Sequence, residues 1–250
     1  MKIITMTAYR RPAYFKQVLD HLALCEGVNK YSCLLQLEPG CQEVHDIAYG
    51  FRDRSVFADM LIHVNDIVRG CNWSTLHVID RGFVYADRLI HLEDDTVPLG
   101  HDFLRYMEWA LDTYREDQEI FSVTGYNRIP KPWLSAADYY AAARRCWFIP
   151  WGWATWQDRW QTWFERQDQV ELSQQSWDAV LGHWVRGNGL NMLRPLLPRI
   201  RNIGAELGAF CPGPEWHRDN QYNEFGSWDL DPPEPRCEYY ETQDPEVSDG

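Results

Sequence analysis

The sequence predicts an α/β fold, Rossmann-like in outline, in which helices flank a mostly parallel central sheet. Short apolar runs alternate with segments of helical periodicity through the first half of the 250-residue chain. This alternation is typical of parallel sheets with right-handed crossovers. The fourth apolar run ends in three consecutive carboxylates, and ligands of open α/β sheets bind at the carboxyl ends of the strands. The chain is long enough for one large core.

Each predicted strand of the first half is a short apolar run, and each predicted helix repeats apolar residues every three or four positions. In the first helix, for example, Phe15, Val18 and Leu22 share one face. Asn72 or Ser74 would cap the third helix. Strands are expected at residues 3–7, 31–37, 58–64, 88–92 and 120–124, and helices at residues 13–25, 42–54, 74–87 and 101–115.

The pattern becomes less regular after about residue 126. Six tryptophans lie between Trp147 and Trp163, and they are either core residues or surfaces for sugar rings. Residues 139–143 are expected to form a strand or a short helix, residues 176–192 to be partly helical, and residues 202–228 to form long loops. The predicted organisation is an N-terminal half at 1–126, a second half of the same domain at 127–228, and an acidic, mobile tail at 229–250.

Composition excludes several classes of function. The formal net charge of −13 and the pI near 5.0 argue against binding to nucleic acid or to an anionic membrane surface. No apolar run approaches the roughly 20 residues of a membrane span, and the first residues enter a strand without a signal-peptide pattern. A cytoplasmic location is the simplest expectation. The seven cysteines form no C-x-x-C pair, so we expect reduced, mostly buried thiols and no structural zinc.

The three acids that end the fourth run are Glu93, Asp94 and Asp95. They would repel one another unless a cation or hydrogen-bond donors face them. Oxygen ligands suit Mg²⁺ or Mn²⁺, which bridge protein carboxylates to substrate phosphates. The plain alternative is a polar turn in which Asp95 helps to cap the next segment. The chain has neither G-x-x-x-x-G-K-[ST] nor G-x-G-x-x-G, so a bound diphosphate would depend on a cation.

Polar loops also follow the first three strands. Tyr9 and Arg11 come after the first strand, where an aromatic ring can stack on a base and an arginine can meet a phosphate. Glu38 follows the second strand and could accept a hydrogen bond from a base, and residues 65–72 follow the third. Taken alone, each loop has the residues of an ordinary turn or helix cap. Four such loops at one sheet edge favour a nucleotide site.

Several short motifs occur in a characteristic order along roughly residues 1–225. They are Thr5-x-Thr7-x-Tyr9-x-Arg11-Pro12, Leu92-Glu93-Asp94-Asp95, the tryptophan-rich residues 151–160, Ser176-Trp177-Asp178 and Asn202-Ile203-Gly204. In this order they resemble the GT-A fold glycosyltransferases, in particular the N-acetylglucosaminyltransferase I type and related bacterial polysaccharide glycosyltransferases. One departure is the loop after the last motif, which reads Ala205-Glu206-Leu207-Gly208 instead of a glycine-rich, aspartate-containing sequence.

The resemblance implies a GT-A fold and transfer of a hexosyl or N-acetylhexosaminyl group from a nucleotide-sugar, with UDP favoured and Mn²⁺ or Mg²⁺ as cofactor. The acceptor would be a glycan or another hydroxyl compound, bound by the second half of the domain. Asp95 would contact the metal, His217 would touch the metal or the diphosphate, and Asp178 would be the general base of an inverting reaction. Nucleotide-sugar binding would involve Thr7, Tyr9, Arg11, Glu38, Asn72, Glu93, Asp94, Trp151, Trp153 and Arg218.

Several alternatives stay open. His217 could be a surface-loop histidine, and Asp178 could simply cap the helix that starts near residue 179. A haloacid-dehalogenase-like phosphohydrolase would need an aspartate where Glu93 stands, on the first strand instead of the fourth. A nucleotidyltransferase would show a glycine-rich loop after the first strand, and residues 7–12 contain no glycine. A non-catalytic carbohydrate-binding protein would explain the tryptophans but not the carboxylates.

Overall fold

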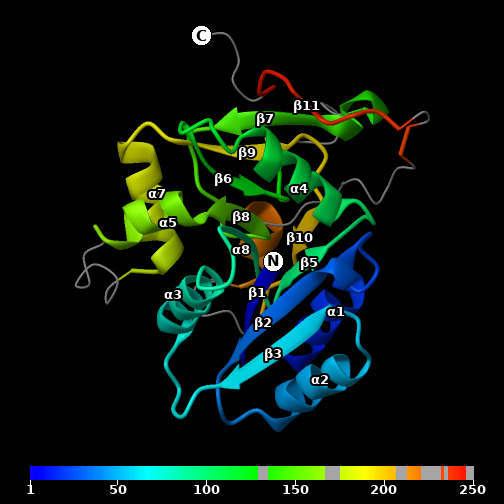
Figure 1. Ribbon diagram of the computed structural model, residues 1–250, viewed down its shortest axis with the longest axis vertical. Coiled ribbons are helices and arrows are strands. Elements are labelled where there is room, and N and C mark those ends of the chain that lie inside the picture. Colours follow the sequence, from blue (N-terminus) through cyan, green and yellow to red (C-terminus); the bar gives the residue numbers. More distant parts are fainter. Residues whose placement is uncertain (129–134, 167–174, 207–212, 221–231, 234–235, 246–250) are drawn as a thin grey trace.

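A nine-stranded mixed sheet forms the centre of the protein (Figure 1). The computed structural model describes residues 1–128, 135–166, 175–206, 213–220, 232–233 and 236–245. Within these residues the strand order is β11-β7-β9-β6-β8-β4-β1-β2-β3. The strands are β1 (Lys2–Ala8), β2 (Tyr31–Leu37), β3 (Asp59–Val64), β4 (Arg88–Glu93), β6 (Ile120–Thr124), β7 (Ala141–Arg145), β8 (Trp153–Trp156), β9 (Asn191–Pro195) and β11 (Tyr240–Glu241).

The first half of the chain has the predicted parallel arrangement. Strand β1 pairs in parallel with β2 and with β4, and β2 pairs in parallel with β3. Thr7 near the end of β1 lies opposite both Gln36 of β2 and Glu93 of β4, so the loops after these strands meet at one edge. The predicted helices are confirmed as α1 (Pro12–Leu22), α2 (Gln42–Asp53), α3 (Cys71–Gly82) and α4 (Phe103–Thr113).

The second half of the chain extends the sheet with both antiparallel and parallel pairs, the latter between β6 and β9 and between β7 and β11. Strand β8 lies antiparallel between β4 and β6, and β7 lies antiparallel to β9. The 3-10 helix Ala136–Tyr140 leads directly into β7, so both structures considered for this stretch occur in succession. A separate pair joins β5 (Thr96–Pro98) to β10 (Ile200–Asn202). The other α-helices among the described residues are α5 (Gln157–Phe164), α7 (Trp177–Gly187) and α8 (Pro214–Asn220).

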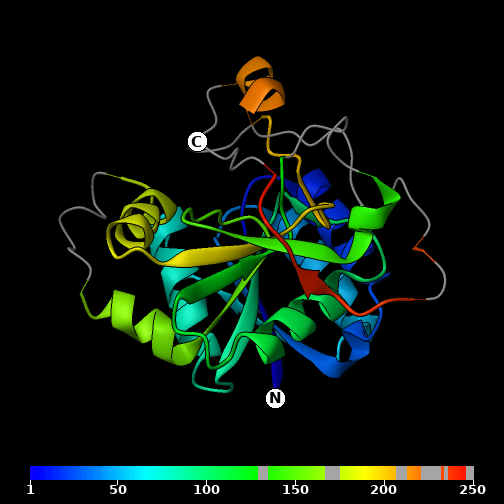
Figure 2. The same ribbon diagram turned by 90° about the horizontal axis from the view of Figure 1, so that it is seen from above.

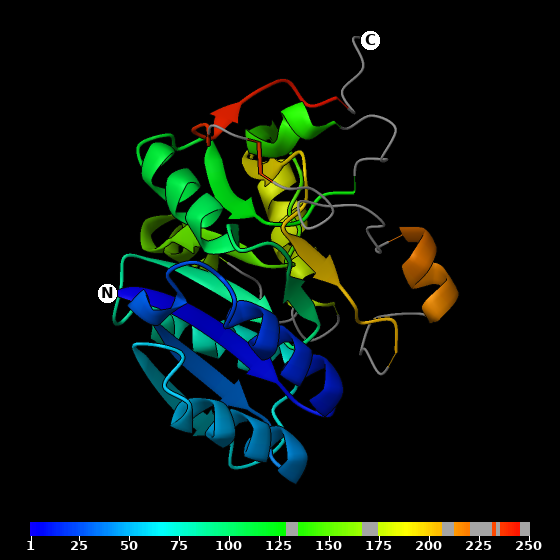
Figure 3. The same cartoon turned by 90° about the vertical axis from the view of Figure 1, so that its right-hand side faces the viewer.

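One helix falls where loops were predicted. Helix α8 lies within the stretch 202–228, and its seven residues are too short for a reliable periodic signal in the sequence. Figures 2 and 3 show α8 standing away from the body of the protein, on the side toward which β1 and β2 point. The N-terminus lies on the opposite side (Figure 2). Helix α8 therefore lies on the side of the sheet edge where the polar loops meet.

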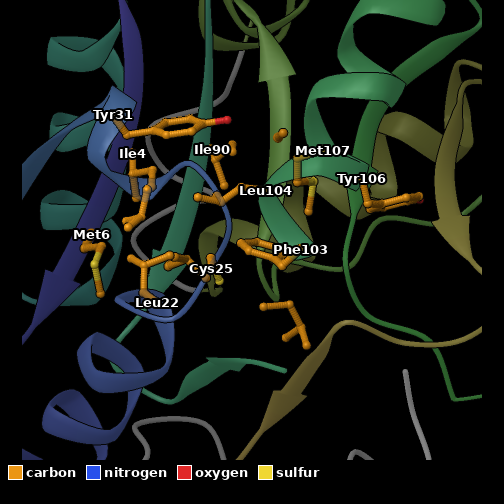
Figure 4. Close-up of a cluster of buried hydrophobic side chains, with 14 of the residues drawn as sticks. Ile4, Met6, Leu22, Cys25, Tyr31, Ile90, Phe103, Leu104, Tyr106 and Met107 are labelled. Carbon is orange, nitrogen blue, oxygen red and sulfur yellow. The ribbon is translucent and has the colours of Figure 1, made fainter. Parts of the chain in front are cut away.

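Helices cover both faces of the sheet because strand residues alternate between two cores. Ile4 and Ile90 pack in one core with α1, α2 and α4, whereas Ile3 and Leu89 pack in the other with α3, α5 and α7. Figure 4 shows part of the first core, in which Ile4, Met6 and Ile90 of the strands lie near Leu22 of α1 and Phe103, Leu104 and Met107 of α4.

Most of the larger buried side chains in the second core are tryptophans. Trp153 packs against Trp177 and Trp160, with ring centroids 5.9 and 6.1 Å apart. Trp163 is also fully buried in this core, and Trp156 is fully buried in the first one. For these residues the structural explanation, a tryptophan-rich core, is the correct one of the two that the sequence left open.

Part of the acidic tail packs against the domain. Tyr239 is buried and donates a hydrogen bond to Asp102 Oδ2 at 2.7 Å. Asp244 forms an ion pair with the buried Arg194 at 2.6 Å, and β11 pairs in parallel with β7. The prediction of a mobile tail therefore does not describe residues 236–245, because the buried ring of Tyr239 and the ion pair of Asp244 with Arg194 hold them against the domain.

The cysteines form no disulfide among the described residues. Cys25 and Cys33 are buried, but Cys71, Cys146 and Cys237 are exposed, so the expectation of mostly buried thiols was wrong. Within the described residues, no helix combines the length and the apolar character that a membrane span requires.

Candidate active site

A cavity of about 470 Å³ lies at the carboxyl ends of β1, β2 and β4, the edge that the sequence indicated. It brings together residues from the loops after β1 and β4, the start of α3, the start of α7 and the segment after β10. The predicted site residues that line it are Thr7, Tyr9, Arg11, Glu38, Glu93, Asp94, Asp95, Trp151 and Asp178. Residues that were not predicted also line it, among them Gln36, Ser74, Asn202 and Gly204.

Arg11 holds the acidic motif in place. Its Nη1 donates to Asp95 Oδ2 at 2.6 Å and its Nη2 to Asp94 Oδ1. The backbone N–H of Tyr9 donates to the other oxygen of Asp94 at 3.3 Å. Pro12 follows at the first position of α1, where its fixed φ suits a helix start. The loop after β1 therefore presents one guanidinium group to two carboxylates of the turn that follows β4.

The charges at this edge are not balanced. Burial raises the pKa of Asp94 to about 6, although the Arg11 guanidinium opposes the shift. Burial also raises the pKa of Glu93, and the Asp95 and Asp178 carboxylates raise it further. One arginine thus faces several carboxylates in a partly desolvated site. A bound cation would favour their charged forms.

Asn202 connects Asp95 to His217. Its Nδ2 lies 3.5 Å from Asp95 Oδ1, while its Oδ1 accepts from His217 Nε2 at 2.8 Å and from the N–H of Gly204 at 2.9 Å. The pairing of β10 with β5 places Asn202 here, far from Asp95 in the sequence. His217 does not line the cavity and reaches Asp95 only through the Asn202 amide, and its contact with the metal or the diphosphate stays a prediction. His217 is buried and is not a surface-loop residue.

The residues around Asp95 fit a divalent cation whose remaining ligands come from the substrate and from water. The contacts from Arg11 and Asn202 use two of the roughly four acceptor positions of the Asp95 carboxylate. Burial lowers the pKa of His217, which keeps its imidazole neutral near pH 7. Among the described residues, no three His, Cys, Asp or Glu side chains form a metal cage. Mg²⁺ and Mn²⁺ are commonly held by one or two carboxylates together with phosphates and water.

Glu38 has a different role from the predicted one. Its carboxylate is buried and accepts four hydrogen bonds from the loop that follows β3 and from α3. The donors are the N–H groups of Arg69 (2.9 Å) and Gly70 (2.7 Å), Ser74 Oγ (2.8 Å) and Asn65 Nδ2 (3.0 Å). These four bonds fill the acceptor capacity of a carboxylate. Glu38 thus fixes the loop at residues 65–74 that forms one wall of the cavity, and does not offer a free acceptor to a base.

Replacing Glu38 by glutamine should destabilise the protein by about 3 kcal/mol, because the charge is lost and an NH₂ group faces two buried donors. We expect a fall in Tm of roughly 6–12 °C for a chain of this size. The exposed Glu165→Gln serves as the control in thermal and urea unfolding. Unchanged stability combined with weaker nucleotide binding would instead restore Glu38 as a nucleoside contact.

Asn72 also has a structural role, and it does not line the cavity of the predicted nucleotide site. Its Oδ1 accepts from the N–H of Trp177 at 3.0 Å and its Nδ2 donates to the carbonyl of Gln175 at 2.8 Å. These bonds tie the start of α3 to the start of α7, where Asp178 occupies the first turn. Asn72 therefore positions the helix that carries Asp178.

Asp178 is not a capping residue in this structure. Helix α7 begins after Ser176, whose own side chain forms no capping hydrogen bond. The Asp178 carboxylate forms no hydrogen bond or ion pair within the described residues. It lines the cavity at the sheet edge and also a second, neighbouring cavity of about 660 Å³, together with Pro150 and Trp151. Its carboxylate is available where the two cavities meet.

Two further predicted site residues line neither cavity. Trp153 is fully buried in the second core and cannot contact a sugar, whereas Trp151 lines both cavities and packs edge-on against Tyr126. Arg218 lines neither cavity, and it lies exposed on α8 beside Asp219 at 3.2 Å. Gly152, with φ of +51°, interrupts the strand pattern between Trp151 and Trp153.

Comparisons with known proteins connect this arrangement to a fold. No protein-family model and no curated protein sequence matches the chain. The structure of Staphylococcus aureus TarS 1-349 matches with a TM-score of 0.59 at 9% sequence identity, over 80% of this chain and 60% of that one. This likeness confirms the GT-A fold.

Other solved structures match less closely. Mannosyltransferase PcManGT from Pyrobaculum calidifontis, in complex with GDP-Man and Mn²⁺, matches with a TM-score of 0.45 at 10% identity, over 62% of this chain and 44% of that one. A CMP:2-keto-3-deoxy-manno-octonic acid synthetase complexed with CTP matches with a TM-score of 0.44 at 12% identity, over 78% of this chain and 89% of that one. The chain spans less than two thirds of the TarS and PcManGT chains.

Proposed function

We propose that the protein is a metal-dependent glycosyltransferase that moves a sugar from a nucleotide-sugar to an acceptor hydroxyl. The observation behind this proposal is that two cavities meet at Asp178 and Trp151, and that one of them contains the cluster of Arg11, Asp94 and Asp95. Such a pair offers a donor site and an acceptor site on either side of a free carboxylate. UDP is the favoured nucleotide because of the sequence resemblance, which also favours a role in polysaccharide synthesis.

The donor would occupy the cavity at the sheet edge. Tyr9 lines it, and the Arg10 guanidinium lies over the Tyr9 ring, 4.6 Å from its centre, so a base would stack on the opposite face of the ring. Arg11 is the basic side chain beside the acidic motif, and it can pair with a phosphate of the donor. The neutral Asn202 and His217 keep Asp95 oriented. A divalent cation bound at Asp95 would neutralise charge on the departing diphosphate.

Asp178 would act as the general base. As the acceptor oxygen forms its bond to the anomeric carbon, the bond from that carbon to the diphosphate oxygen breaks, and the hydroxyl proton passes to the Asp178 carboxylate. Attack from the face opposite the leaving group inverts the anomeric configuration. The position of Asp178 between the two cavities supports this assignment, since the base must reach a hydroxyl on the acceptor side.

The test of the donor site is calorimetric titration of UDP in the presence of Mn²⁺ and then of chelator. Wild type should bind UDP in a metal-dependent manner, and Asp95→Asn should bind at least tenfold more weakly, because a hydrogen bond or ion contact to a charged group is lost. The exposed Asp53→Asn is the matched control. Calorimetric titrations of GDP, CDP and dTDP under the same conditions then identify the preferred base.

Two outcomes would count against the proposal. If no nucleotide bound with or without metal, the glycosyltransferase assignment would fail in favour of glycan binding alone. If UDP bound but Asp95→Asn had no effect, the nucleotide would lie elsewhere than at the acidic motif. A nucleotidyltransferase would instead consume a nucleoside triphosphate and release pyrophosphate, which an assay with each triphosphate detects.

A further inference from the structure

The second cavity is basic although the protein is acidic. The described residues that line it include one carboxylate, Asp178, whereas the chain as a whole has a formal net charge of −13. Basic residues come to it from three separate parts of the chain: the segment after β6, the end of β7 with β9, and helix α7. The arginines that line it are Arg128, Arg145, Arg186 and Arg194.

These arginines differ in their partners. Arg194 is buried and binds both oxygens of Asp244 at 2.6 Å, and Arg145 approaches the same carboxylate at 3.4 Å. Arg186 is exposed, and its guanidinium group forms no hydrogen bond or ion pair in the part of the chain that the structure describes. Because guanidinium groups bind phosphate and carboxylate oxygens in a bidentate manner, Arg186 can offer its charge to a ligand.

Helix α7 sets the distance between the Arg186 guanidinium and the proposed base, Asp178. Asp178, Gly182 and Arg186 follow one another at intervals of four residues and line the same cavity. Eight residues of α-helix span about 12 Å along the axis. Trp147, which is 54% exposed, also lines this cavity and offers an aromatic face to a sugar ring. The cavity therefore suits an elongated ligand with a charge remote from its reacting hydroxyl.

We propose that the second cavity binds an anionic glycan acceptor, whose phosphate or carboxylate group pairs with Arg186 while a hydroxyl reaches Asp178. This inference rests on the proposed glycosyltransferase function and adds the class of acceptor. A contact two helical turns from the reacting hydroxyl is made equally in the ground state and the transition state. It should therefore change the KM for the acceptor more than kcat.

The test compares three tetrasaccharides in equilibrium titrations followed by tryptophan fluorescence, with UDP and Mn²⁺ present. Maltotetraose is neutral, maltotetraose 1-phosphate carries a phosphate, and tetragalacturonate carries carboxylates. At least one of the two anions should bind about tenfold or more tightly than maltotetraose, and Arg186→Gln should remove that difference. The exposed Arg52→Gln on α2 is the matched control. The two anionic sugars distinguish a phosphate from a carboxylate acceptor.

Equal binding of charged and neutral sugars by wild type would overturn the proposal, and so would an unchanged preference in Arg186→Gln. UDP titration of the same samples separates this result from failure of the donor site, because Arg186 lies outside the donor cavity. If UDP binds normally and the anion preference is missing, only the acceptor class is wrong. If the anion preference depends on Arg186 but no nucleotide binds, the anion site stands and the transferase function falls.

Discussion

Replacing Asp178 by asparagine is expected to lower kcat for sugar transfer by about 10²–10⁴-fold, the usual contribution of a positioned general base. Asparagine keeps the shape of the side chain but cannot accept the proton. The first turn of α7 would lose a favourable charge at the helix N-terminus, which contributes about 0.3–1 kcal/mol. The fold and the affinity for the nucleotide should therefore survive. Initial rates with saturating donor and acceptor, together with UDP titration, measure the two quantities separately.

The control for this experiment is Glu43→Gln, which removes the exposed acid in the first turn of α2 and so repeats the helix-terminus effect far from the cavities. Its kcat should equal that of wild type. Full activity in Asp178→Asn would mean that Asp178 is not the general base and acts only as an acid at the helix N-terminus. The inverting mechanism, which depends on this base, would then lose its support. Loss of UDP binding in the same variant would show instead that the substitution disturbs the donor cavity.

The sheet edge could be predicted from the sequence because the patterns that indicate it are local. Apolar runs of five to seven residues alternate with helical spacing, and parallel strands joined by helices bring their carboxyl ends together. Thr7, Tyr9, Arg11 and the acidic motif therefore meet as expected. The antiparallel insertion of β8 between β4 and β6 was not predicted, since pairing between distant strands leaves no periodic signal in either of them.

Site residues were assigned wrongly where their role depends on contacts between distant segments. Glu38 looks like an exposed acid after a strand, but residues 65–74 fold over it and use every acceptor position. Asn202 was part of a quoted motif, yet its position between Asp95 and His217 depends on the pairing of β10 with β5. Trp151 and Trp153 should share a face by strand alternation, and the positive φ of Gly152 separates them.

Gly204 gives a second strong test of the site, because the close approach of its backbone to the Arg11–Asp95 pair leaves no room for a side chain. A Cβ atom at this position would overlap Asp95 Oδ2 and lie 3.2 Å from Arg11 Nη1. Gly204→Ala should therefore push the carboxylate away from the guanidinium. A displacement on the order of 1 Å at a reacting site can cost about 10²-fold, and we expect a loss of that size in kcat/KM, together with weaker UDP binding.

Gly50→Ala is the matched control for this substitution, since Gly50 lies within α2 and a Cβ there would meet no heavy atom within 4 Å. Alanine at that helical position should keep full activity and add about 0.5–1 kcal/mol of stability. Thermal unfolding of both variants separates a local effect at Asp95 from general destabilisation. Wild-type kcat/KM and UDP affinity in Gly204→Ala would mean that the Asp95 carboxylate can shift freely. The precise pairing of Arg11 with Asp95 would then have no part in binding the donor, and the acidic motif would need another role.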